Sequence, residues 1–437
     1  MGHEIPHATA LESLTFSLLY SLPEFARGIV IRRPAMTRRL ARLDAHRFCM
    51  RLRVRYGGRS LYVRGPRGKT LLLLSQGDVE RVLTGSDSVF SLRTEEKWRG
   101  FSPVQPDGLL LSRGEEREDR RRFTHAVLQP GQASHDLARR IDQVMAEELD
   151  AILGRSPGVV HWARLRDRYY RAILRVVLGD AARDDVQILG ALNALRGEGN
   201  WLGLRPWRRK RMRRLRRAMM AGVGYHVAVA ADGSLAGLCA TAPQTPHTCP
   251  AGQLPHWLMA LESLGTTVIG PTLALLAGHP EHYERARAGD RDHLRACLYE
   301  SLRLWPLVPT LPRVVTTPTG WHGAMLAAGT DIVIPVAVHN RNPQIDYADA
   351  FTPQVWLDGR ASADWWIVPF SGGPGRCPGA DLGIQVGVSA LAALLRQYDF
   401  HPIGPKLGPD RPLPKTLDPF SLRLKVSPRS QSSQTID

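Results

Sequence analysis

Apolar residues recur at helical spacing in two long stretches of the chain. The stretch from Leu254 to Ala277 is mostly apolar, which is typical of a helix buried in a protein core. Further along, apolar residues follow one another at i, i+4, i+7 and i+11: Ile384, Val388, Leu391 and Leu395. This spacing predicts an amphipathic helix over residues 380–398.

Shorter patterns predict the rest of the scaffold. Helical spacing is present in three further segments: 136–153, 165–178 and 292–304. Two strands, 60–63 and 70–74, are predicted on either side of Gly65-Pro66-Arg67-Gly68, which has the composition of a β-turn. A third, 331–338, is predicted because the segment is rich in Val and Ile. Residues 90–111 mix Ser, Gly, Pro and isolated aromatics, and they predict a long loop. We therefore expect a mainly α protein with a smaller β part.

Composition places the chain among ordinary globular proteins, because 43% of its 437 residues are hydrophobic and 23% are charged. The five cysteines are odd in number and widely spread along the chain, so they suggest no disulfide framework. A reducing, cytoplasmic compartment follows from this usage. Residues 1–12 and 428–437 lack periodicity, and we expect both ends to be loose.

We expect no signal peptide, because no charged segment near the start of the sequence leads into an apolar run with a cleavage site. Its best apolar stretch, Leu14–Leu22, is too short to cross a bilayer. The sequence therefore predicts a soluble protein without a membrane anchor.

The formal net charge is +17, which makes nucleic acid, an anionic membrane or an acidic protein candidate partners. Nine basic residues lie between Arg205 and Arg217, interspersed with Trp207, Met212 and Leu215. Such a run can bind phosphates or an anionic membrane. Because no nucleic-acid fold signature accompanies it, we favour a solvated helix face and expect no nucleic-acid partner.

Glycines and prolines crowd a single cysteine in the stretch 370–379, whose sequence is Phe-Ser-Gly-Gly-Pro-Gly-Arg-Cys-Pro-Gly. The backbone there must turn tightly and can approach a ligand closely. Cys377 precedes the predicted helix, and a helix N-terminus favours an anion, so we expect a lowered thiol pKa and thiolate ligation of a metal. A redox or nucleophilic cysteine would use the same electrostatics, but no second cysteine is near in sequence.

This decapeptide resembles the cysteine-ligand loop of the cytochrome P450 family, F-x-x-G-x-R-x-C-x-G. The matching residues are Phe370, Gly373, Cys377 and Gly379. The family's arginine, which helps to hold a haem propionate, is Gly375 here, and Arg376, one residue later, is expected to bind the cofactor. The resemblance implies a cytochrome P450 fold of the soluble bacterial type, with one domain over residues 13–427. It also implies haem b as cofactor and Cys377 as the axial ligand of its iron.

The resemblance implies further roles elsewhere in the chain. It places Arg117, Arg121 and Arg313 at positions that commonly bind haem propionates. It also makes Glu300 and Arg303 a structural ion pair that supports the cysteine loop. The third member of that network is an arginine in the family but Val355 here, so the sequence predicts an incomplete network.

The central helix of the family carries the motif A-G-x-D/E-T, whose acid and alcohol help to deliver protons during oxygen activation. Counting back from His279-Pro280-Glu281 without gaps puts Ser263 and Leu264 at these positions, whereas anchoring on Gly265 puts Thr267 and Val268 there. Neither register restores the pair. The remaining polar candidates are Glu262, Ser263, Thr266 and Thr267. Pro271 is expected to bend this helix, because it lacks an N–H and clashes with the preceding turn.

Three functions follow as hypotheses. The first is oxidative tailoring of a small, largely apolar molecule in specialised metabolism, by a cytoplasmic monomer that takes two electrons from an acidic ferredoxin-type donor and uses dioxygen. The second is group transfer or rearrangement of a preactivated substrate without oxygen activation, for example nitrene-type transfer, which the missing acid–alcohol pair suggests. The third is a basic nucleic-acid or membrane-binding protein built around residues 205–217.

Overall fold

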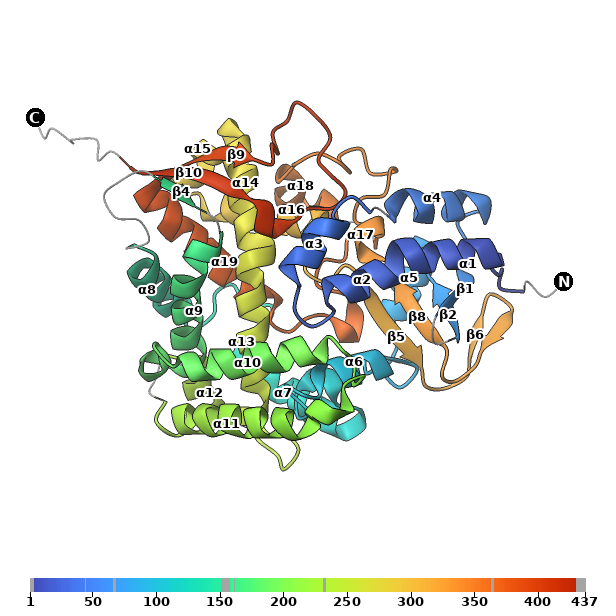
Figure 1. The fold of residues 1–437 in the computed structure, drawn as a ribbon, viewed down its shortest axis with the longest axis horizontal. Coiled ribbons are helices and arrows are strands. Elements are labelled where there is room, and N and C mark those ends of the chain that lie inside the picture. Colours follow the sequence, from blue (N-terminus) through green and yellow to red (C-terminus); the bar gives the residue numbers. More distant parts are fainter. Residues whose placement is uncertain are drawn as a thin grey trace, which may run out of the picture.

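A computed structural model describes residues 4–43, 45–65, 68–150, 158–160, 162–230, 233–362 and 365–429. Figure 1 shows a large helical part and a smaller strand-rich part, beside which the first helices of the chain lie. The α-helices are α1 (Ala10–Phe16), α2 (Leu22–Arg27), α3 (Pro34–Leu40), α4 (His46–Arg55), α5 (Gln76–Thr84), α6 (Glu95–Phe101), α7 (Gly114–Leu128), α8 (Ala138–Leu149), α9 (Trp162–Leu178), α10 (Val186–Gly199), α11 (Arg209–Ala228), α12 (Leu235–Thr241), α13 (Pro250–Leu264), α14 (Gly270–Gly278), α15 (Pro280–Arg287), α16 (Arg291–Leu304), α17 (Val336–His339), α18 (Gln354–Leu357) and α19 (Ala380–Gln397). The expected mainly α fold with a smaller β part is confirmed.

The strands form three small sheets in the part of the chain that the structure describes. The largest has the order β1-β2-β8-β5-β3, in which only the pair β2 and β8 is parallel. A second sheet has the order β4-β10-β9, and β6 pairs with β7. The strands are β1 (Leu61–Gly65), β2 (Gly68–Leu72), β3 (Phe90–Ser91), β4 (Gly158–Val160), β5 (Leu311–Val315), β6 (Thr319–Trp321), β7 (Ala324–Leu326), β8 (Asp331–Ile334), β9 (Tyr398–Gly404) and β10 (Arg423–Pro428).

One long helix runs through the middle of the helical part (Figure 1). It comprises α13, a π-helical turn η5 (Gly265–Ile269) and α14. The expected disturbance near Pro271 takes the form of this wide turn directly before the proline, where the missing N–H leaves a carbonyl of the preceding turn without its usual donor. The helix, Pro250–Gly278, is long and apolar enough to cross a membrane, but 78% of its most apolar window is buried inside the protein, as in a core helix.

The prediction of a long loop over residues 90–111 is wrong. The structure has β3, α6 and a 3₁₀ turn η2 (Leu109–Leu111) in this segment. Helix α6 begins at a standard cap, because the Thr94 side chain accepts a hydrogen bond from the Lys97 backbone N–H and two glutamates follow in the first turn. Ser, Gly and Pro in the segment concealed this start signal.

The expected looseness of residues 1–12 is also wrong from residue 4 onward. Thr9 and Glu12 form a capping box at the start of α1, and Ile5 is buried. At the other end Pro428 closes β10, and the Arg429 backbone N–H donates to the Gln397 carbonyl. The rest of the expected loose C-terminus, 430–437, lies outside the described residues. The predicted strand 331–338 is half correct, since β8 ends before Pro335 and α17 follows.

Helix α16 carries a fully buried ion pair between Glu300 and Arg303. The Arg303 guanidinium also donates to four backbone carbonyls of the segment 340–350. The predicted gap at Val355 does not leave the network incomplete, because Glu300 accepts hydrogen bonds from the Trp356 indole N–H at 2.9 Å and from the Thr352 backbone N–H at 2.8 Å. Every oxygen of the buried carboxylate therefore has a donor.

Two buried histidines make the fold sensitive to acid. Burial lowers the pKa of His293 and of His339 to about 4, and both side chains are inaccessible to solvent. A histidine in the unfolded chain has a pKa of about 6.5, so the unfolded chain binds more protons and stability falls as the pH drops below that value towards about 4. We expect each histidine to cost about 2 kcal/mol of unfolding free energy between about pH 7 and pH 5.

Urea denaturation at these two pH values, monitored by circular dichroism, measures this loss of unfolding free energy. His339→Gln should reduce the pH dependence, because glutamine keeps a donor for the Leu73 carbonyl that His339 Nε2 contacts at 2.9 Å but does not titrate. The exposed His401→Gln is the control and should leave the pH dependence unchanged. Equal pH dependence in His339→Gln and in the unaltered protein would contradict the assignment.

Candidate functional site

The cysteine loop is a tight turn that ends at the start of α19. The Cys377 backbone N–H donates to the Phe370 carbonyl at 3.0 Å, which closes the loop, and Gly379 caps the helix. Inside the loop lies a 3₁₀ turn η7 (Gly373–Gly375). Gly373 has φ +55°, and a Cβ there would lie 2.2 Å from the Leu83 carbonyl oxygen, so this position requires glycine. The Phe370 ring packs edge-on against Tyr299 of α16, with ring centroids 5.8 Å apart.

Gly375, the departure from the family pattern, makes room for another arginine. A Cβ at this position would lie 3.0 Å from the Arg313 guanidinium and 3.3 Å from Leu92. Arg313 comes from β5, is buried, and donates to Ser371 Oγ at 3.0 Å. The structure therefore replaces the arginine of the loop by one from a strand that lies more than sixty residues earlier in the chain.

Four cations gather beside the cysteine loop: Lys97, Arg117, Arg121 and Arg313. Burial lowers the pKa of Lys97 well below its usual value, and the charges of Arg313 and Arg117 lower it further. Burial also lowers the pKa of Arg313 to about 10. Asp87 and Glu96 act in the opposite direction on Lys97, and Asp87 approaches Arg117 at 3.5 Å. Basic side chains thus predominate beside the cysteine loop.

This arrangement fits the haem that the sequence implies. A haem has two propionates, and charge-assisted hydrogen bonds to guanidinium and ammonium groups suit these carboxylates. Glycines on the cysteine loop leave its backbone free of side chains that would obstruct a flat ring. The residues that would hold the cofactor are Cys377, Phe370, Gly373 and Gly379 from the loop, with Lys97, Arg117, Arg121 and Arg313 for the propionates.

Arg376, expected at the propionates, lies elsewhere in the structure. Its guanidinium approaches Asp381 in the first turn of α19 at 3.7 Å, and its side chain is half exposed. The expectation of a lowered pKa for the Cys377 thiol is also wrong for the protein without a bound metal. Burial raises the pKa of Cys377, because lost hydration outweighs the Gly379 backbone N–H and the charges of Arg376 and Arg121.

On the central helix, the structure removes Glu262 and Ser263 from the set of free proton donors. Arg196 of α10 donates to the Glu262 carboxylate and, at 2.7 Å, to Ser263 Oγ. Tyr170 of α9 donates to the other oxygen of Glu262. Burial lowers the pKa of Arg196 to about 10, although the charge of Tyr170 acts to raise it. The acid of the central helix thus joins three helices as a buried ion pair.

The two threonines lie one turn further on, in η5. Thr267 Oγ1 donates to the Ser263 carbonyl at 2.7 Å, as buried threonines in helices often do. Thr266 is half-buried, and its hydroxyl has no hydrogen-bond partner among the described residues. Thr266 is therefore the one candidate of the four whose side chain is free to contact a ligand or a water molecule.

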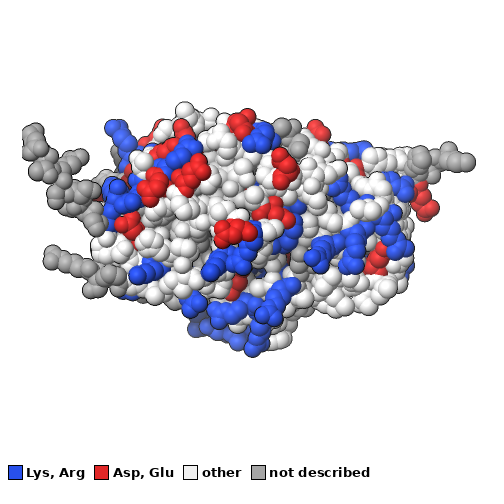
Figure 2. Space-filling model, turned by 90° about the horizontal axis from the view of Figure 1, so that it is seen from above, with Lys and Arg blue, Asp and Glu red and all other residues white. Residues whose placement is uncertain are grey.

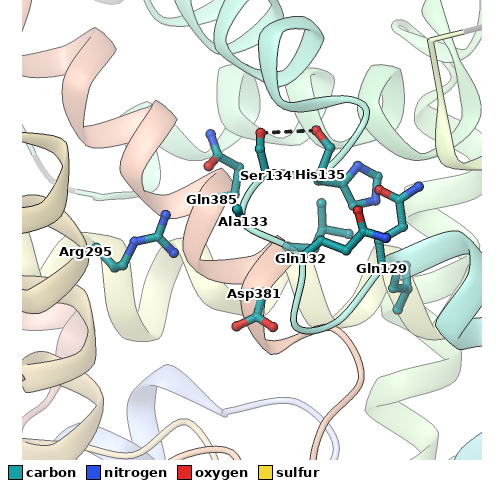
Figure 3. Close-up of a pocket in the computed structure, with 10 residues that line it drawn as sticks. Gln129, Gln132, Ala133, Ser134, His135, Arg295, Asp381 and Gln385 are labelled. Carbon is teal, nitrogen blue, oxygen red and sulfur yellow. Dashed lines mark hydrogen bonds between the residues drawn. The ribbon is translucent and has the colours of Figure 1, made fainter. Parts of the chain in front are cut away.

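A small pit lies on the surface beside the start of α19 (Figure 3). Its volume is about 20 Å³, which is close to a single water molecule and too small for a substrate. Asp381 faces the pit from α19, Arg295 from α16, and Gln129 from the segment that follows α7. Asp381 also accepts a hydrogen bond from the Gly131 backbone N–H at 2.8 Å, which holds this segment against α19.

Sequence reasoning missed two residues of the site. Lys97 was missed because residues 90–111 were expected to form a loop, although a lysine one turn after a capped helix start was a usable signal. Arg196 was missed because it lies 66 residues before Glu262, and nothing in the sequence pairs them. Only the packing of α10 on α13 brings these two charges together.

The cysteine loop lies in a region that the chain shares with known proteins. The family model named cytochrome P450 matches residues 266–418, a range that contains the whole loop. The chain is 32% identical over 152 residues to the putative cytochrome P450 137 of Mycobacterium tuberculosis, which covers 33% of this chain and 32% of that protein. It is 33% identical over 150 residues to secologanin synthase 1 of Catharanthus roseus, which covers 30% and 29%. The chain thus spans about a third of the length of the curated relatives it matches.

Among solved structures, the fold is similar to the crystal structure of CYP175A1 from Thermus thermophilus. The TM-score is 0.65 at 20% identity, and the match covers 88% of this chain and 96% of that chain. The likeness therefore extends over the fold, whereas the sequence matches are confined to smaller regions.

Proposed function

Because the chain belongs to the cytochrome P450 family, we propose that it is a haem-thiolate enzyme that oxidises a small, largely apolar molecule with dioxygen and two electrons. The observation that carries this proposal is the position of Cys377 at the start of α19, beside a partly buried cluster of four basic side chains. The enzyme would be a cytoplasmic monomer, and its metabolic role would be to modify a specialised metabolite.

When bound, the haem supplies a thiolate-ligated iron that activates dioxygen. The Cys377 sulfur is its anchor, and the four cations fix its orientation through the propionates. Phe370 packs against Tyr299 of α16, which holds the start of the loop against that helix. The polar groups of the central helix are mostly engaged within the protein, so this helix offers a substrate an apolar face and the free hydroxyl of Thr266.

An acidic ferredoxin-type protein would deliver the electrons. Support comes from the arginines near the start of α19: Arg376 is half exposed and lies just before the Gly379 cap, and Arg122 of α7 is exposed. Arg295 faces the pit in the same region (Figure 3). A carboxylate-rich partner would find complementary charge there.

The runner-up is group transfer from a preactivated substrate without oxygen activation. The observation that favours it is the ion pair of Glu262 with Arg196, which leaves the central helix without a free acid. Without an oriented proton donor, reductive activation of dioxygen is slower unless a water at Thr266 or the substrate supplies the proton. A substrate that carries its own leaving group does not need this proton.

Two incubations of the haem-loaded protein separate the two functions. A panel of small apolar molecules is first selected by the shift that each causes in the Soret band. With a reductant and isotopically labelled dioxygen, the proposal expects labelled oxygen in the product and no product under argon. The runner-up instead expects an O-acylated hydroxylamine probe to give an aminated product and free carboxylate under argon, without reductant. Product in the argon arm alone would overturn the proposed oxidation.

A further inference from the structure

Four leucines on the first helical segment form an exposed apolar stripe, which we name the leucine stripe: Leu11, Leu14, Leu18 and Leu22. Their side chains are between 48% and 73% exposed. The segment runs from α1 through the π-helical turn η1 (Ser17–Ser21) into α2, and its other face is buried through Phe16 and Pro23. The wider π turn keeps residues four apart nearly in line, so the stripe stays on one face.

The surroundings of the leucine stripe are strongly basic. The first 59 residues contain eleven arginines and four acidic residues. Of the described acids, Glu12 and Glu24 are already in ion pairs, with Arg55 at 3.0 Å and with Arg27 at 2.8 Å. Exposed arginines of this region include Arg38, Arg39, Arg42, Arg47 and Arg51. Lysine and arginine patches are plain in Figure 2, which shows one face of the molecule.

An open groove of about 600 Å³ adjoins the stripe. Leu19, which follows Leu18, lines it together with Leu43, Arg42 and Arg47. The carboxylate in this groove, Asp349, is already paired with Arg341 at 2.6 Å and Lys415 at 2.7 Å. Apolar walls beside two guanidinium groups without an ion pair to any described residue suit an amphiphile with an anionic head.

The basic run 205–217 is connected to the same segment. The Asn200 side chain accepts a hydrogen bond from the Val30 backbone N–H at 2.7 Å, and the Arg33 guanidinium lies 5.0 Å from the Trp201 ring, so the end of α2 docks against the end of α10. Leu204 and Trp207 follow and are 62% and 71% exposed. Seven cations of the run have no ion pair among the described residues: Arg209, Lys210, Arg211, Arg213, Arg214, Arg216 and Arg217.

We propose that the leucine stripe and its flanking arginines form a docking surface for a lipid bilayer with anionic headgroups. A helix with leucines on one face and arginines beside it lies in a bilayer interface, with the cations at the headgroups. A second copy of the chain would bring arginines against arginines around the stripe, and this repulsion disfavours a symmetric dimer. Nucleic acid would use the arginines but leave the leucines in water.

The test is co-sedimentation of the haem-loaded protein with lipid vesicles. We expect binding to vesicles in which about a third of the phosphatidylcholine is replaced by phosphatidylglycerol, and at least about tenfold weaker binding to pure phosphatidylcholine, with a loss of binding at high salt. The double variant Leu14→Glu, Leu18→Glu should bind the anionic vesicles at least about tenfold more weakly. Arg38→Gln, Arg42→Gln and Arg47→Gln together should have a similar effect.

Matched controls separate position from charge. Val186→Glu with Met325→Glu adds the same two charges at exposed apolar residues outside the stripe, and Arg122→Gln, Arg166→Gln and Arg396→Gln remove the same three cations elsewhere. Both should bind as the unaltered protein does, and circular dichroism should show all variants folded.

Three results would overturn the proposal. One is no binding to either kind of vesicle. Another is a dimer of the unaltered protein, in sedimentation velocity, that Leu14→Glu, Leu18→Glu converts to a monomer. The last is equal vesicle binding by the stripe variant and its control, with salt-sensitive binding of duplex DNA by both, which would assign the surface to nucleic acid.

Discussion

Cys377→Ser should abolish the thiolate-type Soret band of the reduced, carbon monoxide-treated protein and lower turnover by about three orders of magnitude or more. A serine hydroxyl does not deprotonate to a strong ligand at neutral pH, whereas a cysteine thiol does so readily beside a metal cation. The cation cluster is intact in this variant, so haem can still be bound. Optical difference spectra and single-turnover product analysis measure the two effects separately.

Cys249→Ser is the matched control, because this cysteine is exposed and precedes α13, far in sequence from the cysteine loop. It should keep both the band and the activity. If Cys377→Ser kept the thiolate-type band, or if the unaltered haem-loaded protein never showed it, the sulfur would not be the ligand and the proposed function would fail with it.

The cysteine loop could be predicted from the sequence because all its constraints are local. A run of glycines and prolines around one cysteine, followed by helical spacing, requires no partner from elsewhere in the chain. The propionate cluster is different, because it draws on α6, α7 and β5. Gly375 occupies the position of the family's arginine, and Arg313, more than sixty residues earlier in the chain, lies beside it. A single sequence does not reveal such a long-range contact.

The same distinction between local and long-range constraints explains which elements of the fold could be predicted. The long helices were predicted because burial of a whole face imposes a clear period, whereas α6 and α17 have only seven and four residues, too few to show one. Trp356 makes the clearest example of a contact that the sequence does not reveal. The sequence revealed the missing arginine at the position of Val355, but only the structure shows an indole N–H from the next residue in its place.

The fully buried pair in α16 gives the largest expected effect on stability. Glu300→Gln keeps the shape of the side chain, but it has one acceptor oxygen, whereas Thr352 and Trp356 donate to different oxygens of the carboxylate. It also leaves the Arg303 guanidinium charged and without an anion at 0% exposure. Removal of one partner of a buried ion pair costs about 3–5 kcal/mol, because an uncompensated charge remains in the interior. We expect a loss of this size in the free energy of unfolding, measured by urea denaturation.

The chain supplies its own control for this substitution, because Glu284 and Arg287 repeat the E-x-x-R spacing on α15 with an exposed glutamate. Glu284→Gln should change the unfolding free energy by less than about 1 kcal/mol, since exposed ion pairs contribute little. Arg303→Met should be as damaging as Glu300→Gln, because it leaves the opposite charge buried. A small effect of both α16 variants would contradict the assignment, because Arg303→Met removes the donors to the four carbonyls as well as the charge that balances Glu300.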